Sequence, residues 1–168
     1  IDQLGLGWRS HLLACGFGGE IIERDDCIVV RSPSNPTYYW GNYLLFERAP
    51  GPGDARRWPM LFDQLIAANQ PLSTHRAFGW MEDASGDVDE FLADGYSQNN
   101  AVVMQSTDLP LVPAPTIDAQ LQPFALDGAE AESAWSALVE LSVATRDPQY
   151  GEAGYRSFAR QHVASWRA

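Results

Sequence analysis

Hydrophobic and polar residues alternate in short runs over the first hundred residues, which is the pattern of half-buried strands. In two segments the apolar residues instead recur at every third or fourth position, as on one face of a helix. The predicted strands cover residues 8–14, 20–23, 27–31, 38–46, 76–81 and 101–106, and the predicted helices cover residues 54–69 and 88–93. This order is typical of an α+β protein with α/β-like layers, in which helices flank a mixed, mostly antiparallel sheet.

A proline-rich segment at 109–115, LPLVPAP, predicts an extended linker between residues 1–108 and residues 116–168. The second part reads as one strand followed by two helices, and it has no further strands to close a sheet. It either folds back onto the first sheet or opens a domain that continues beyond Ala168. The three elements are predicted at residues 117–126, 130–145 and 156–167.

Composition narrows the possible functions. The 168-residue chain is 45% hydrophobic, enough for a packed core, and its formal net charge is −11. An acidic chain is a poor binder of nucleic acid or of an anionic membrane surface. All 11 basic residues are arginine, so the sequence excludes Schiff-base chemistry on a lysine and a P-loop lysine.

The cysteine and histidine positions predict neither a metal site nor a disulfide. Cys15 and Cys27 fit no metal-ligand spacing, and they would not lie opposite one another in a hairpin. The three histidines, His11, His75 and His162, are scattered and show no zinc spacing. No apolar run approaches the length of a membrane span, and no signal peptide is evident. We therefore expect a cytoplasmic protein with two reduced cysteines.

Residues 38–62 carry the strongest functional pattern, an aromatic strand followed by a Pro/Gly turn and an amphipathic helix. A strand–glycine turn–helix junction binds phosphates, because free amides and the helix dipole converge there. The turn RAPGPG, from Arg48 to Gly53, fits R-x-x-G-x-G. It resembles the pyrophosphate loop of the GNAT (GCN5-related) N-acetyltransferase superfamily.

The resemblance extends over nearly the whole chain. Residues 1–108 resemble the later half of the GNAT fold, and residues 116–168 look like its opening strand and helices, so the fold is incomplete or permuted. The segment PSNPTYYWGNYLLFERAPGPGD is similar to the N-terminal region of bacterial two-domain GNAT proteins, in which a degenerate first half precedes a complete acetyltransferase domain. An intact cofactor loop would then lie downstream of Ala168.

This resemblance implies acetyl transfer from acetyl-CoA, as co-substrate, to a small-molecule amine or a protein N-terminus, and it is compatible with a homodimer. Two features of the turn weaken it as a cofactor loop. Pro50 and Pro52 have no amide to donate. Asp54 places a negative charge where a diphosphate would lie, and as a helix N-cap it would compete for the same amides. The cofactor-binding residues implied are Arg48, Gly51, Gly53, Asp54, Ala55 and Arg56.

The proton donor of the family has no counterpart here. FLADGY, from Phe91 to Tyr96, matches the family's Tyr-x-x-x-Gly-Phe element, but Phe91 has no hydroxyl and Tyr96 falls on a position that packs into the core. We therefore expect an acetyl-CoA-dependent N-acetyltransferase to which this chain contributes a non-catalytic or cofactor-degenerate part. The alternatives are a non-catalytic GNAT-like module for binding or assembly, and an unrelated α+β domain whose rigid turn matches by chance.

Overall fold

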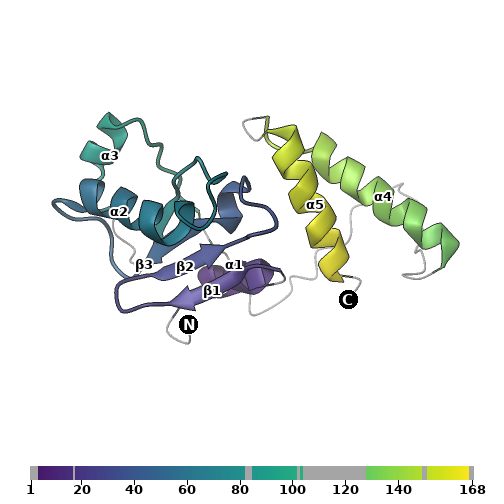
Figure 1. The fold of residues 1–168 in the computed structure, drawn as a ribbon, viewed down its shortest axis with the longest axis horizontal. Helices are drawn as coiled ribbons and strands as arrows, with labels where there is room; N and C mark the ends of the chain where they lie inside the picture. The colour runs from purple at the N-terminus through teal and green to yellow at the C-terminus, as the bar shows by residue number, and fades with distance from the viewer. Residues whose placement is uncertain are drawn as a thin grey trace, which may run out of the picture.

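The protein has an α+β fold in which helices flank a four-stranded mixed sheet (Figure 1). The computed structural model describes residues 4–16, 18–81, 85–101, 103, 128–148 and 151–166. The strands are β1 (Glu20–Glu23), β2 (Ile28–Arg31), β3 (Tyr43–Phe46) and β4 (Phe78–Trp80). The helices are α1 (Leu6–Gly16), α2 (Asp54–Phe62), α3 (Asp89–Ala93), α4 (Ala129–Ala144) and α5 (Glu152–Trp166). None of these helices is long and apolar enough to cross a bilayer.

The sheet has the order β1-β2-β3-β4. The first three strands pair antiparallel, with Val30 opposite Ile21 on one side and Tyr43 on the other. β4 then pairs parallel to β3, with Leu45 opposite Gly79. A parallel pair needs a crossover connection, and α2 supplies it. The glycine turn therefore lies where β3 ends and α2 begins.

The alternating side chains of β2 and β3 divide the core into two layers. Figure 1 shows α2 and α1 on opposite sides of the sheet. On the α2 side the Trp58 ring stacks on Phe46, with centroids 3.9 Å apart and planes 8° apart. That layer contains Val29, Leu44, Phe46, Trp58, Phe62 and Ile66, and the α1 layer contains Leu12, Ile28, Val30, Tyr43 and Leu45.

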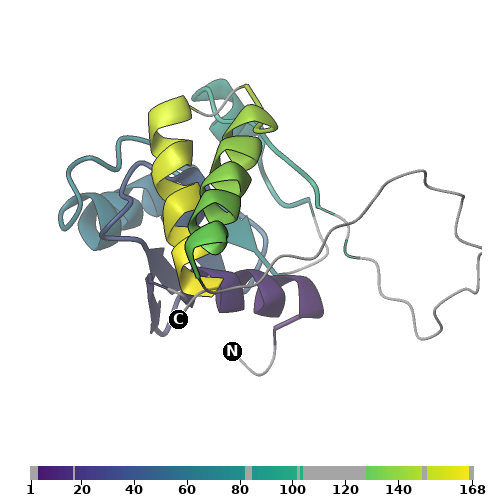
Figure 2. The ribbon, with the colours of Figure 1, turned by 90° about the vertical axis from the view of Figure 1, so that its right-hand side faces the viewer.

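The helix pair α4–α5 has a small core of its own and docks on the first part through α5. Figure 2 shows the two helices side by side, and Trp135, Val139 and Val163 are buried between them. The Phe158 ring stacks on Tyr38 with centroids 3.9 Å apart. Gly154 approaches the loop before β3 so closely that a Cβ added there would lie 2.8 Å from Thr37 Oγ1.

Several predicted elements are confirmed. The strands at 20–23, 27–31 and 76–81 and the short helix at 88–93 are present, with ends that shift by one or two residues. The helix predicted at 54–69 is α2 and its π-helical continuation Asp63–Ala67. The two C-terminal helices are α4 and α5. The predicted linker at 109–115, the strand at 117–126 and most of the strand at 101–106 lie outside the described residues.

The prediction of a strand at residues 8–14 is wrong, because α1 is a helix from Leu6 to Gly16. Trp8, Leu12 and Cys15 follow one another at intervals of four and three positions, and all three contact the same core layer. The polar run between Trp8 and Leu12 obscures this helical spacing in the sequence.

The prediction of a long strand over residues 38–46 is also wrong, since only Tyr43–Phe46 pairs in the sheet. Tyr39–Gly41 forms a short 3₁₀ helix instead. The cause is the side-chain amide of Asn42, whose Nδ2 donates to the carbonyls of Asn35 at 3.0 Å and Tyr38 at 2.8 Å. These bonds hold the chain in a turn that an extended strand could not make.

The Asn42 network also reaches two distant segments. Asn42 Oδ1 accepts hydrogen bonds from the Ser32 backbone amide at 2.8 Å and from Gln70 Nε2 at 2.7 Å. His75 Nε2 lies 3.2 Å from the Asn42 carbonyl. The side chain is fully buried, and all four of its hydrogen-bonding positions are used. Any replacement would leave several buried polar groups without partners.

Asn42→Ala is expected to reduce the free energy of unfolding by about 3 kcal/mol or more, because four partner groups lose their hydrogen bonds inside the core. Urea denaturation followed by tryptophan fluorescence measures this. Asn69→Ala is the matched control, since that exposed amide makes a single bond to Leu65 O at 3.3 Å and should cost less than about 0.5 kcal/mol. Equal losses in the two variants would contradict the central role of Asn42.

Candidate functional site

The glycine turn from Arg48 to Gly53 leads from β3 into α2. Gly53 is the residue before the helix and has φ 85° and ψ −8°, a left-handed conformation that favours glycine. Asp54 was expected as the helix N-cap, but it is the first helical residue, and no side chain caps the helix. This position lets the Asp54 carboxylate turn back toward the loop.

The Asp54 carboxylate is bound by the turn itself. One oxygen, Oδ2, accepts the Gly51 amide proton at 2.9 Å and lies 2.7 Å from Arg48 Nη1. The other, Oδ1, lies 3.4 Å from Arg57 Nη1. The side chain is only 4% exposed. Asp54 thus takes the Gly51 amide from within the chain, although it does so from the first helical position and not as the N-cap.

The environment of Asp54 favours its charged form. Burial opposes ionisation, but the bond from the Gly51 amide and the interactions with Arg48 and Arg57 outweigh it and lower the pKa of the carboxyl below 3.8. Asp54 is therefore an anion at neutral pH. It provides the negative charge that a helix N-terminus stabilises.

Few amides of the turn remain for a ligand. The Asp54 amide donates to Gly51 O at 3.1 Å, and the Arg56 and Arg57 amides donate to Gly53 O at 3.2 and 3.1 Å. The backbone amides of Gly53 and Ala55 donate to no acceptor within the part of the chain that the structure describes. The structure therefore brings the predicted loop residues together, but most of their donors bond within the loop.

A cavity of about 480 Å³ adjoins the turn. Its charged lining consists of three carboxylates and two guanidinium groups, which leaves one negative formal charge in excess. Arg57 also lies 2.9 Å from Asp26, so both arginines pair with carboxylates. These five residues are Asp26, Glu47, Arg48, Asp54 and Arg57. The cavity is large enough for part of a nucleotide, but its charge opposes a diphosphate.

The expected proton-donor position is apolar. Phe91 is buried against Trp58 and Phe78, with ring centroids 5.5 and 5.9 Å apart. Tyr96 packs edge-on against Phe91 at 5.5 Å, which confirms its expected place in the core. Its hydroxyl lies beside the Arg76 guanidinium. Neither residue presents a free hydroxyl at the turn.

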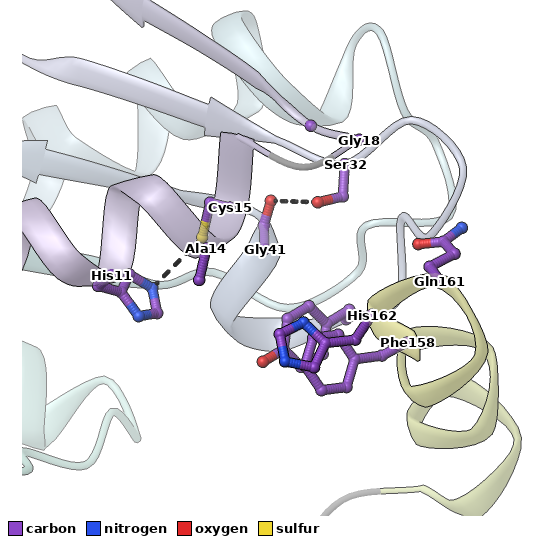
Figure 3. A pocket seen from close by; sticks show the side chains of 11 residues that line it. His11, Ala14, Cys15, Gly18, Ser32, Gly41, Phe158, Gln161 and His162 are labelled. Atoms are coloured by element: carbon purple, nitrogen blue, oxygen red, sulfur yellow. Dashed lines mark hydrogen bonds between the residues drawn. The ribbon is translucent and has the colours of Figure 1, made fainter. Parts of the chain in front are cut away.

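A second, smaller cavity of about 120 Å³ lies between α1 and α5 (Figure 3). His11 and Cys15 line it from α1, and His162 and Phe158 line it from α5. His11 and His162 are far apart in the sequence, so the sequence analysis did not predict that they line the same cavity. His11 and Cys15 are four residues apart, and reading residues 8–14 as a helix would have placed them on one face.

His11 and Cys15 are held against the carbonyl of Trp40. His11 Nε2 lies 3.2 Å from Trp40 O and 3.5 Å from Cys15 Sγ. Burial lowers the pKa of His11, which the bond to Trp40 only partly offsets, and burial raises the pKa of Cys15 to about 11. A thiol in this state is a poor nucleophile. Cys15 and Cys27 are both free, as the sequence predicted.

Comparison with known proteins does not assign the chain to a family. The chain matches no family model, no curated protein and no solved structure. The GNAT resemblance therefore rests on the turn and strand motifs of the sequence alone.

Asp54→Asn is expected to lower the free energy of unfolding at pH 7 by about 1–2 kcal/mol, because the amide keeps one hydrogen bond but loses its charge. The folded pKa of Asp54 lies below 3.8, so its ionic contribution is present above that pH and is lost as the pH falls through the folded pKa. Denaturation measured at stepwise lower pH from pH 7 should show the two proteins converging as the pH falls through the folded pKa of Asp54. A difference that persists unchanged in acid would indicate a packing effect instead.

Proposed function

We propose that this chain is a GNAT-like part of an acetyl-CoA-dependent N-acetyltransferase in which residues 48–56 form a structural turn. Acetyl transfer to the amine then takes place at a cofactor loop other than this one. The chain supplies the scaffold beside that reaction. Its two free cysteines fit the cytoplasmic compartment proposed for such an enzyme.

The observation that carries this proposal is the position of the Asp54 carboxylate. It takes the Gly51 amide and the Arg48 guanidinium, the two kinds of donor that a pyrophosphate needs at a helix N-terminus. At an effective dielectric constant of about 20, each phosphate charge held about 4 Å from this carboxylate would be repelled by about 4 kcal/mol. Asp54 therefore fills the anion site from within the chain.

The topology supports the family part of the proposal. β3, the turn, α2 and β4 form a parallel crossover unit, the arrangement in which phosphate-binding turns occur. The missing hydroxyl at Phe91 supports the non-catalytic part, since the leaving thiolate would have no proton donor there. Together these features support a GNAT-like scaffold that does not itself catalyse acetyl transfer.

The docking of α5 favours a second candidate, a self-contained module for binding or assembly. The side-chain Nδ2 of Asn35 donates to Gly154 O at 3.5 Å, and the Tyr38 ring stacks on Phe158. These contacts attach the helix pair to the first part, as expected if residues 116–168 complete a permuted fold. In this candidate no acetyl transfer is associated with the chain.

Calorimetric titration with acetyl-CoA tests the structural role of the turn. The chain itself is expected to give no saturable heat at millimolar cofactor, because Asp54 occupies the anion site. Asp54→Asn removes the charge and should allow weak binding, which the added change Arg56→Glu should abolish. Asp63→Asn is the matched control, because this exposed carboxylate pairs with Arg76 away from the turn, and no gain is expected.

Saturable binding to the unchanged chain that Arg56→Glu removes would overturn the structural role and restore the turn as a cofactor loop. The open reading frame beyond Ala168 separates the two candidates. Strands followed by an uninterrupted R/Q-x-x-G-x-G/A loop would support the acetyltransferase scaffold, and a stop codon would support the independent module.

A further inference from the structure

The helix pair α4–α5 meets the first part of the protein at the loop that precedes β3. The side-chain Nδ2 of Asn35 lies 3.5 Å from Gly154 O, at the long limit of a hydrogen bond. The rings of Tyr38 and Phe158 stack with their centroids 3.9 Å apart. Contacts of this kind resemble a transient interface between proteins, for which relative motion of the two parts is the expected behaviour.

The two helices hold each other more firmly than they hold the first part. Their facing residues form a separate core, which contains Ala131, Trp135, Val139, Val143, Ala159 and Val163. Arg156 of α5 pairs with Glu140 of α4 and also with Glu152 on its own helix. The helix pair can therefore leave the first part as a unit and keep its own packing.

Release of the helix pair would open the cavity between α1 and α5. Figure 3 shows His162 and Phe158 of α5 across this cavity from His11 and Cys15 of α1. The His162 ring also stacks on Phe158, with centroids 5.3 Å apart, so it belongs to the same docked surface as the stack on Tyr38. When α5 leaves, the cavity loses one wall and its imidazole groups become accessible to water.

In the part of the chain that the structure describes, no carboxylate and no guanidinium lines this cavity. The titratable neighbours of His11 are Cys15 on the same helix, Tyr43 of β3, Tyr38 of the loop before β3 and His162 of α5. Burial lowers the pKa of His11, and the hydrogen bond to the Trp40 carbonyl offsets this only in part. A proton on His11 is therefore poorly accommodated while α5 is docked.

We propose that α4 and α5 form a detachable unit that docks on the first part near neutral pH and is released when His11 and His162 take up protons. Histidine is the side chain whose charge changes between pH 5 and 8. The imidazolium is better solvated once the cavity is open, so proton uptake favours the undocked state. The release is separate from the glycine turn and does not depend on acetyl transfer.

The pH range of the release follows from the direction of the pKa shift. Because the pKa of His11 is lowered from 6.5 in the docked state, docking is unaffected by pH above about 6.5 and weakens as the pH falls from there toward the docked-state pKa. Each proton taken up can change the docking equilibrium by at most about tenfold per pH unit. Release exposes the rings of Tyr38 and Phe158.

Small-angle X-ray scattering over a range of pH tests the release. The radius of gyration of the unchanged chain is expected to be constant above about pH 6.5 and to increase reversibly as the pH is lowered to about 5.5, while the far-UV circular dichroism stays the same. Phe158→Ala removes the stack on Tyr38. This variant should show the larger radius at neutral pH and so provides the reference for the undocked state.

Substitution of the two histidines tests their role. His11→Gln combined with His162→Gln keeps polar side chains at both positions but removes the groups that take up protons, so the double variant should stay compact in acid. The matched control is His75→Gln, which removes a buried histidine that stacks on Tyr39 and does not line the cavity. This control should be released at the same pH as the unchanged chain.

Thiol labelling of the unchanged chain covers the case in which a variant fails to fold. The pKa values of Cys15 and Cys27 are about 11 and about 12, so both thiolates decrease alike in acid and the ratio of their labelling rates reports exposure. We expect the ratio of Cys15 to Cys27 labelling by a dipyridyl disulfide to rise at least about fivefold between neutral pH and about pH 5.5.

Three results would each overturn the proposal. The first is a radius of gyration and a labelling ratio that both stay constant down to about pH 5.5. The second is an increase in radius that coincides with loss of the far-UV signal, which indicates unfolding instead of release. The third is a double histidine variant that expands in acid at the same pH as the unchanged chain.

Discussion

The buried amide of Asn42 holds the first part of the protein together. Its two donors and two acceptor positions join the loop at 32–38 to Gln70, which follows the π-helical segment, and the backbone carbonyl of Asn42 contacts His75. A buried amide is stable only when all its positions are used. This requirement sets the residue at which the turn ends and β3 begins. It thereby also positions the segments on either side of β3, which are the Trp40 carbonyl before it and the glycine turn after it.

The glycine turn illustrates how one carboxylate changes the meaning of a motif. The residues of R-x-x-G-x-G are present, and the helix dipole is aligned with them. Because Asp54 is placed one residue inside the helix, its side chain folds back and satisfies the loop internally. The geometry that makes a helix N-terminus a good anion site thus lets the Asp54 carboxylate stabilise the turn between β3 and α2.

The sequence allowed prediction of elements whose cause is local. The β1–β2 hairpin and the helix after the glycine turn follow from spacing and turn residues, whereas the place of Tyr96 in the core was implied by the family resemblance. The turn at Tyr39–Gly41 could not be predicted, because its cause is a hydrogen-bond network with Gln70 and Ser32, far away in sequence. The cavity of His11 and Cys15 was missed since its helix was read as a strand. His162 lies across the cavity from His11 and Cys15 because α5 docks on the first part of the chain, and no local sequence pattern predicts that docking.

The close approach of Gly154 to Thr37 has a consequence for how the protein tolerates change in its middle. The hydrogen bond between Asn35 and Gly154 spans 119 positions of the chain. The entropy of closing such a loop rises only logarithmically, by about 0.6 kcal/mol for each doubling of length. Insertions or deletions between the two parts therefore affect their attachment little, whereas one added methyl group at Gly154 would push the helix away from the loop. The contact therefore depends on shape at a single position more than on the length of the connection.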